Sequence, residues 1–98
     1  MDVLLFVRKE NYGKVREKLL KDEKASLLSI TFRDAKNLGK EEEGYYCHLS
    51  GSEEYCKRAL EIVKDLAEEV EEQEKEEVLE KIKEEEKKAL EGFGALIG

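Results

Sequence analysis

The residues of this 98-residue chain whose side chains could do chemistry close together are Cys47, His48 and Cys56. Structural zinc sites usually have paired ligands two to four residues apart, and this spacing does not supply them. Neighbouring side chains in a strand point to opposite faces, so Cys47 and His48 cannot act as a thiol and its base. A pairing of His48 with Cys56 stays open, although nothing favours it. We expect both cysteines to be small hydrophobic core residues, and we name no catalytic residue, metal site or cofactor.

A second set of candidates lies on one face of a predicted sheet. Residues 27–33 alternate, which places Ile30 and Phe32 on one face and Thr31 and Arg33 on the other. Phe6 of the first predicted strand, and Tyr46 and His48 of the third, would lie on the same face as Arg33. We therefore predict a ligand or RNA face made of Phe6, Arg33, Tyr46 and His48.

Over about 50 residues the chain resembles the RNA-recognition motif, whose first and third strands stack bases on aromatic side chains. Leu5-Phe6-Val7 is similar to the short motif of the first strand, and Gly44–Leu49 is loosely similar to the Gly-aromatic motif of the third. The second aromatic residue of that motif is missing, and Glu43 stands where a basic residue normally precedes it. The resemblance implies RNA binding by an open sheet face, which is our alternative function.

The elements that would position these residues follow the order β-α-β-β-α. Val3–Val7 is an apolar run typical of a central strand, and a helix follows Asn11. Residues 27–33 and 45–49 read as two further strands, and a second helix begins near Glu53. We predict an α+β fold with a ferredoxin-like βαββα body. Its fourth strand is expected to be missing from its usual place after the second helix, or to be supplied late by the C-terminal tail.

The C-terminal part of the chain carries two apolar stripes separated by a polar segment, Glu71–Glu77. At about 100° per residue the centres of the two stripes lie roughly 130° apart on one straight helix. The chain must therefore bend near this segment, or the second stripe must face a different surface. The residues predicted to form an interface are Val78, Leu79, Ile82, Ala89, Leu90, Phe93, Leu96 and Ile97. They would cover the chain's own open sheet face or pack on a second copy.

Charge is unevenly distributed along the chain and limits the partners. Residues 53–98 carry a net charge of −8, whereas residues 1–52 are close to neutral. An acidic half disfavours nucleic-acid phosphate and anionic membranes, so we expect no membrane and no DNA partner, and RNA only through the N-terminal half. Two cysteines without a disulfide framework suit a reducing cytoplasm. One Gln, two Asn and abundant Lys and Glu are typical of heat-adapted proteins.

These observations predict a two-part organisation. Residues 1–70 form the α+β body, and residues 71–98 form a helical arm and apolar tail that pack on the body or on a second subunit. We expect a non-enzymatic binding or assembly module that is homo-oligomeric, with a dimer favoured. A small ligand sensed by the sheet face is a further hypothesis, and it rests on analogy between folds.

Overall fold

The elements of regular structure within residues 1–97 follow the order βαββαβα. The computed structural model describes the backbone of residues 1–97 and the side chains of residues 1–88. The helices and strands are β1 (Asp2–Arg8), α1 (Tyr12–Lys21), β2 (Ser29–Asp34), β3 (Gly44–Ser50), α2 (Glu53–Val63), β4 (Glu68–Glu69) and α3 (Glu72–Ile97). Short 3-10 turns precede α1, β2 and the loop to β3.

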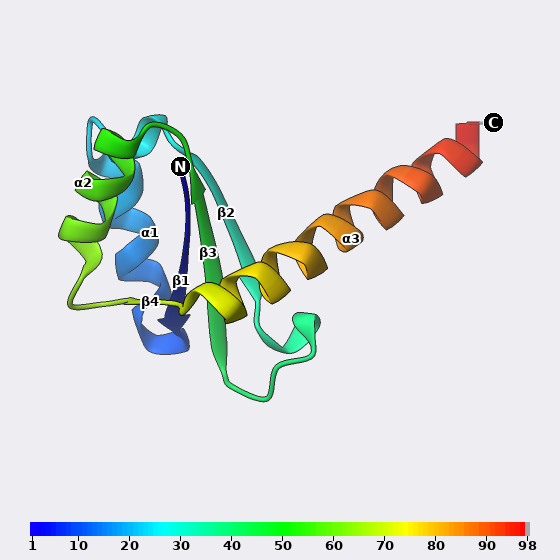
Figure 1. Ribbon diagram of the computed structural model, residues 1–98, viewed down its shortest axis with the longest axis horizontal. Coiled ribbons are helices and arrows are strands. Elements are labelled where there is room, and N and C mark those ends of the chain that lie inside the picture. Colours follow the sequence, from blue (N-terminus) through cyan, green and yellow to red (C-terminus); the bar gives the residue numbers. More distant parts are fainter. Residues whose placement is uncertain (98) are drawn as a thin grey trace.

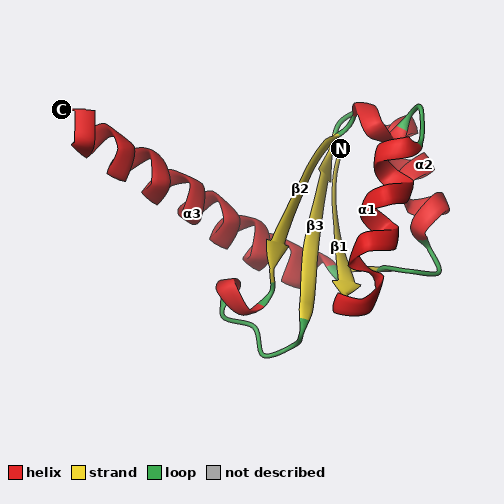
Figure 2. Ribbon diagram, turned by 180° about the vertical axis from the view of Figure 1, so that it is seen from behind, coloured by secondary structure: helices red, strands yellow, loops and turns green. Residues whose placement is uncertain are grey.

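The strands form one antiparallel sheet in the order β2-β3-β1-β4 (Figure 1). β1 lies along the whole of β3, with Asp2 opposite Ser50 and Arg8 opposite Gly44. Helices α1 and α2 cover one face of the sheet, which we call the inner face. Helix α3 crosses the other, outer face and then continues beyond the sheet (Figure 2). The apolar run of β1 therefore belongs to a central strand with helices on both sides, as its composition predicts.

Alternation along β1 divides its side chains between two separate cores. Val3, Leu5 and Val7 point to the inner face and pack with buried residues of α1 and α2. Leu4 points to the outer face and is also fully buried. The outer core consists of the buried residues Leu4, Ala35, Leu38, Tyr46, Val78 and Ile82. The two apolar stripes of the C-terminal half thus serve different faces of one sheet, α2 the inner and α3 the outer.

The expectation that no strand follows the second helix is wrong. β4 comes directly after α2 and pairs with β1, with Leu5 opposite Glu69 and Phe6 opposite Glu68. The N–H of Val70 extends this edge by donating to the carbonyl of Leu4 at 3.0 Å. β4 is two exposed glutamates held by main-chain hydrogen bonds, so it carries no apolar pattern that a sequence reading could detect. The C-terminal tail is not this strand, because residues 95–97 belong to α3.

The break between the two stripes lies before the polar segment. α2 begins after Ser52, whose hydroxyl accepts a hydrogen bond from the N–H of Tyr55 at 3.3 Å, and it ends at Val63. The N–H groups of Leu66 and Ala67 both donate to the carbonyl of Val63, which closes a turn. Helix α3 starts at Glu72, so almost all of Glu71–Glu77 is helix rather than hinge. The redirection of the chain occupies residues 64–71.

Candidate functional site

The outer sheet face brings together the four residues predicted as a ligand or RNA face. Tyr46 of β3 lies opposite both Phe6 of β1 and Arg33 of β2 in the sheet register. The rings of Phe6 and Tyr46 meet edge to face, with centroids 5.5 Å apart. His48 lies two residues further along β3, on the same face.

Helix α3 covers the aromatic part of this face. Tyr46 is only 1% exposed, and its hydroxyl donates to the Glu74 carboxylate of α3 at 2.7 Å. Burial first, and then the Glu74 carboxylate, raise the pKa of Tyr46 well above its usual value, so the phenol stays protonated. An RNA base could stack on Tyr46 only after α3 had left the sheet, since the ring has no free face while the helix is docked.

Polar contacts join α3 to the β2–β3 loop and to β2. In the loop before β3, Lys40 pairs with Glu77 at 3.2 Å, and the Lys81 ammonium donates to the carbonyl of Leu38 at 3.2 Å. At β2, Arg33 lies 3.8 Å from Glu85 and 3.6 Å from Glu86. Partly exposed ion pairs of this kind contribute about 0–1 kcal/mol each, so buried Val78 and Ile82 must hold the helix and the ion pairs orient it.

A groove of about 290 Å³ opens between α3 and the outer face at the end of the sheet nearest the N-terminus. Its polar lining comes from three strands and from α3, and its apolar lining comes from Leu79 and Ile82 of α3. The remaining lining residues are Asp2, Ser29, Thr31, His48, Ser50, Lys83 and Glu86. Hydroxyl groups, an imidazole and charges of both signs around an apolar floor could hold a small polar molecule.

The histidine of this groove is paired with a carboxylate, not with a nucleophile. His48 Nε2 lies 2.9 Å from Asp2 Oδ1. This hydrogen bond, followed by one from Ser50, lowers the pKa of Asp2 below its usual value. Cys47 points to the inner face, and burial raises the pKa of its thiol to about 12. Cys56 also lies in the inner core with a raised thiol pKa, again because of burial. Neither thiol is poised to ionise beside His48.

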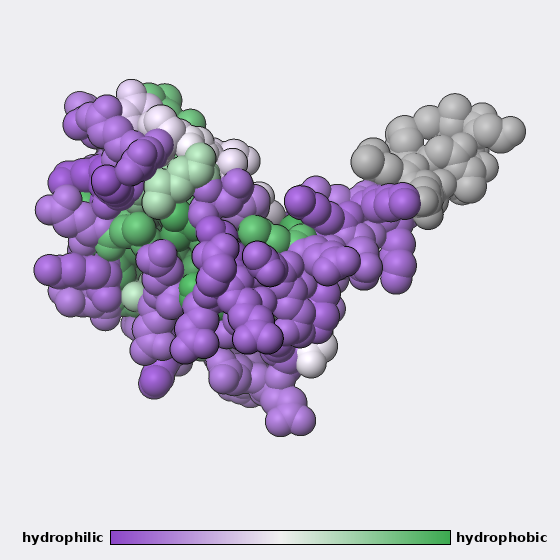
Figure 3. All heavy atoms as spheres, in the orientation of Figure 1, coloured by the Kyte–Doolittle hydropathy of each residue, from purple (hydrophilic) through white to green (hydrophobic). Residues whose placement is uncertain are grey.

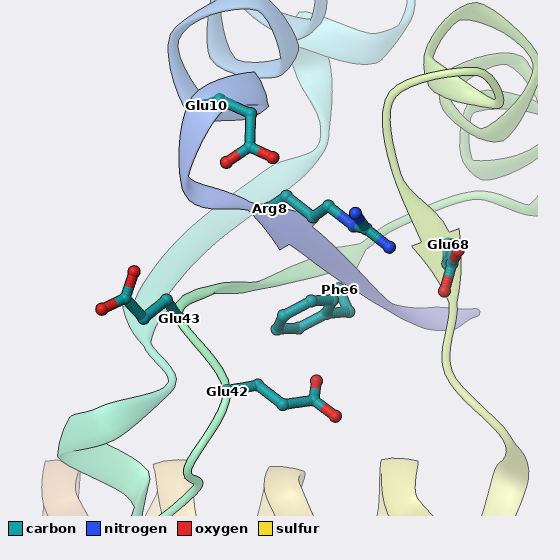
Figure 4. Close-up of a pocket in the computed structure, with 6 residues that line it drawn as sticks. All are labelled: Phe6, Arg8, Glu10, Glu42, Glu43 and Glu68. Carbon is teal, nitrogen blue, oxygen red and sulfur yellow. The ribbon is translucent and has the colours of Figure 1, made fainter.

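A second, acidic hollow lies at the opposite end of β1 and was not predicted from the sequence. It has a volume of about 420 Å³ and is lined by Phe6, Arg8, Glu10, Glu42, Glu43 and Glu68 (Figure 4). Arg8 extends over the Phe6 ring toward Glu68 in this view. The sequence could have shown that Arg8 belongs to the face of Phe6, because it follows Phe6 by two residues in the same strand. Gly44 makes room for Phe6, because a Cβ there would lie 2.7 Å from the ring. Four carboxylates around one guanidinium make the hollow negative.

The predicted interface residues fall into two groups. Val78 and Ile82 are buried in the outer core and Leu79 is partly buried against it, so these three serve the chain's own fold. Ala89, Leu90, Phe93, Leu96 and Ile97 lie outside the residues whose side chains the structure describes. Over the rest of the view in Figure 3 the surface is mostly hydrophilic, with small apolar patches beside the helices.

Comparisons with models of protein families, with curated proteins and with solved structures found no match. Among the residues that the structure describes, no helix is long and apolar enough to cross a membrane. Within the same part of the chain, no cluster of three or more His, Cys, Asp or Glu side chains could hold a metal ion. The geometry of the outer face and of α3 therefore has to support any functional proposal.

Proposed function

We propose that this chain is a non-enzymatic assembly module, a ferredoxin-like body that forms homodimers through the half of α3 extending beyond its sheet. The observation that carries the proposal is the division of α3. Its first turns cover the outer face, and its remaining turns project past β2, where residues 1–97 place no further strand beneath them (Figures 1 and 2).

Helix geometry gives the projecting part a substantial length. At 1.5 Å per residue, the 26 residues of α3 span about 39 Å. Arg33 on β2 contacts Glu85 and Glu86, so the helix passes the sheet edge near these residues. About three turns then lie beyond the edge. A short helix without tertiary contacts is marginal in water, so a partner surface would stabilise it.

The sequence of the projecting part supports such a surface. Val78 and Ile82 bury their side chains in the outer core, and the sequence continues at helical spacing with Ala89, Phe93 and Leu96. A polar helix that served only as a solvated arm would not need apolar residues at these positions. A second copy is the simplest partner, because closed two-fold dimers are the commonest assemblies of soluble chains.

Nothing in the groove chemistry favours catalysis over binding. His48 is engaged with Asp2, and the two thiols lie in the inner core with raised pKa values. The groove under α3, around Thr31 and His48, is where a small polar ligand would bind. Such a ligand would contact both the sheet and α3, so it could modulate how firmly the arm is docked.

The test is the solution mass of the full chain, measured by sedimentation and light scattering across micromolar concentrations. We expect a dimer that Phe93→Glu converts to monomer. Lys88→Gln is the matched control, because it changes the charge of the same helix by the same amount at an exposed position and should leave the dimer intact. A wild-type chain that is monomeric throughout this range would refute the proposal.

A further inference from the structure

The outer edge of β2 is a free strand edge. β2 pairs with β3 along Ser29–Asp34, and within the described part of the chain no strand pairs with its other side. The segment Ser-Ile-Thr-Phe-Arg-Asp is rich in residues that favour strands and holds no proline. Proteins usually protect such an edge by covering it, twisting it or placing charges on it, because its unpaired N–H and C=O groups can pair with another strand.

The hydrogen bonds around β2 tell which main-chain groups face the open side. The N–H of Ala35 donates to the carbonyl of Gly44 on the β3 side at 2.9 Å. The main-chain N–H and C=O groups of successive residues in a strand point to opposite sides. Those of Thr31 and Arg33 therefore point toward β3, like those of Ala35, whereas those of Ile30 and Phe32 point to the open edge. Consistent with this, the Phe32 carbonyl accepts a hydrogen bond at 3.2 Å from Nη1 of Arg33, the next residue in the chain, and not from a strand within residues 1–97.

We propose that two copies of this chain pair through their β2 edges, antiparallel and centred on Thr31, to form one continuous eight-stranded sheet. This inference rests on the proposed function, because it adds the β2 edge to the projecting half of α3 as a second surface of the proposed dimer. In a two-fold antiparallel pair one residue must lie opposite its own copy, and the same face of both sheets then points the same way.

The side chains favour this register over the ones centred on Arg33 or Phe32. With Thr31 at the centre, Ile30 faces Phe32 of the partner subunit twice, and their outward-pointing main-chain groups can exchange four hydrogen bonds. Both side chains are only partly buried against the inner core in the single chain, so the pairing would extend that core across the junction. Centring the pair on Arg33 would oppose two guanidinium groups, and centring it on Phe32 would place Ile30 against an aspartate.

The position of α3 fits the same arrangement. Because the two-fold axis is perpendicular to the sheet, both copies of α3 lie on the outer face and both cross the junction. The projecting half of each helix would then lie over the partner's side of the sheet, antiparallel to the partner's helix. One partner would thus supply both a paired strand for the free edge of β2 and a surface for the projecting half of α3. Each chain carries a net charge of −7, so added salt should strengthen the dimer by screening repulsion.

The test is a cysteine scan of the full chain under oxidised glutathione. Thr31 lies at a non-hydrogen-bonded position of the proposed pair, where opposing side chains approach closely enough for a disulfide. We expect Thr31→Cys to form a disulfide-linked dimer and Ser29→Cys not to, because the two Ser29 positions would lie about 13 Å apart. A mixture of Ser29→Cys and Arg33→Cys chains should cross-link with each other. The native thiols are buried and serve as a silent background.

Amide exchange of the unmodified chain gives a second readout that needs no variant. When the dimer is populated at high concentration, the N–H groups of Ile30 and Phe32 should exchange at about one-tenth of their rate in the monomer, or more slowly still. Those of Thr31 and Arg33, already bonded to β3, should not depend on concentration. A dimeric mass without the Thr31 cross-link and without this protection overturns β2 pairing but leaves the assembly module standing. A monomeric mass at every concentration overturns both.

Discussion

Val78→Ala tests whether α3 is held by apolar packing on the outer sheet face. Val78 is fully buried among Leu4, Leu38 and Tyr46. The substitution removes two methyl groups, each worth about 0.8 kcal/mol of transfer free energy, and leaves a small cavity. Together these terms predict a loss of about 2 kcal/mol in the free energy of unfolding. For a chain of this size the melting temperature should fall by roughly 8–16 °C.

Urea unfolding followed by circular dichroism measures the change directly. Glu76→Ala is the control, since Glu76 lies two residues earlier in the same helix and is exposed. Its stability should stay within about 0.5 kcal/mol of the wild type. If Val78→Ala were equally neutral, α3 would not be packed on the sheet in solution. The proposals that depend on its position would then lose their basis.

Two further predictions concern the groove between α3 and the sheet. The lowered pKa of Asp2 stabilises the folded chain above the ordinary carboxyl pKa of 3.8, and this contribution disappears as pH falls through the folded value. Asp2→Asn should therefore have a lower free energy of unfolding than wild type near pH 7. The difference between the two chains should shrink as pH falls below 3.8, which acid denaturation of both chains measures. A difference that does not depend on pH would contradict the His48–Asp2 contact. Small zwitterions at millimolar concentration, with amino acids as the first probes, should shift the NMR signals of the His48 ring. Lys83→Gln should weaken this binding and Lys57→Gln, on α2, should not; no shift with any probe would remove the ligand hypothesis.

Much of the fold is encoded locally and could be predicted from the sequence. The apolar run of β1 and the alternation of β2 and β3 each identify a strand, because packing on a sheet requires side chains of one kind at a period of two. The offset between the two C-terminal stripes is also a local property, and it left two alternatives, a bend in the chain or a different surface for the second stripe. The structure combines them, because the chain turns between α2 and α3 and the two helices pack in the inner and outer cores.

Other features exist only because remote segments meet. β4 is held by the main chain of β1, so its two glutamates give no signal in the sequence. Tyr46 is a second example, because it was predicted to lie on an open sheet face and is buried instead. Its position on the sheet face follows from its place in β3, but its burial depends on Val78, Glu74 and the path of α3.

The sequence by itself determined which residues lie on which face of each element, since the periods of helix and strand set that directly. Only the tertiary structure decided that α3 of the same chain crosses the face of Phe6, Arg33, Tyr46 and His48 and buries Tyr46. It also decided that the uncovered main-chain groups lie along β2. Side-chain periodicity cannot reveal a free edge, because an edge depends on which strand ends up beside which.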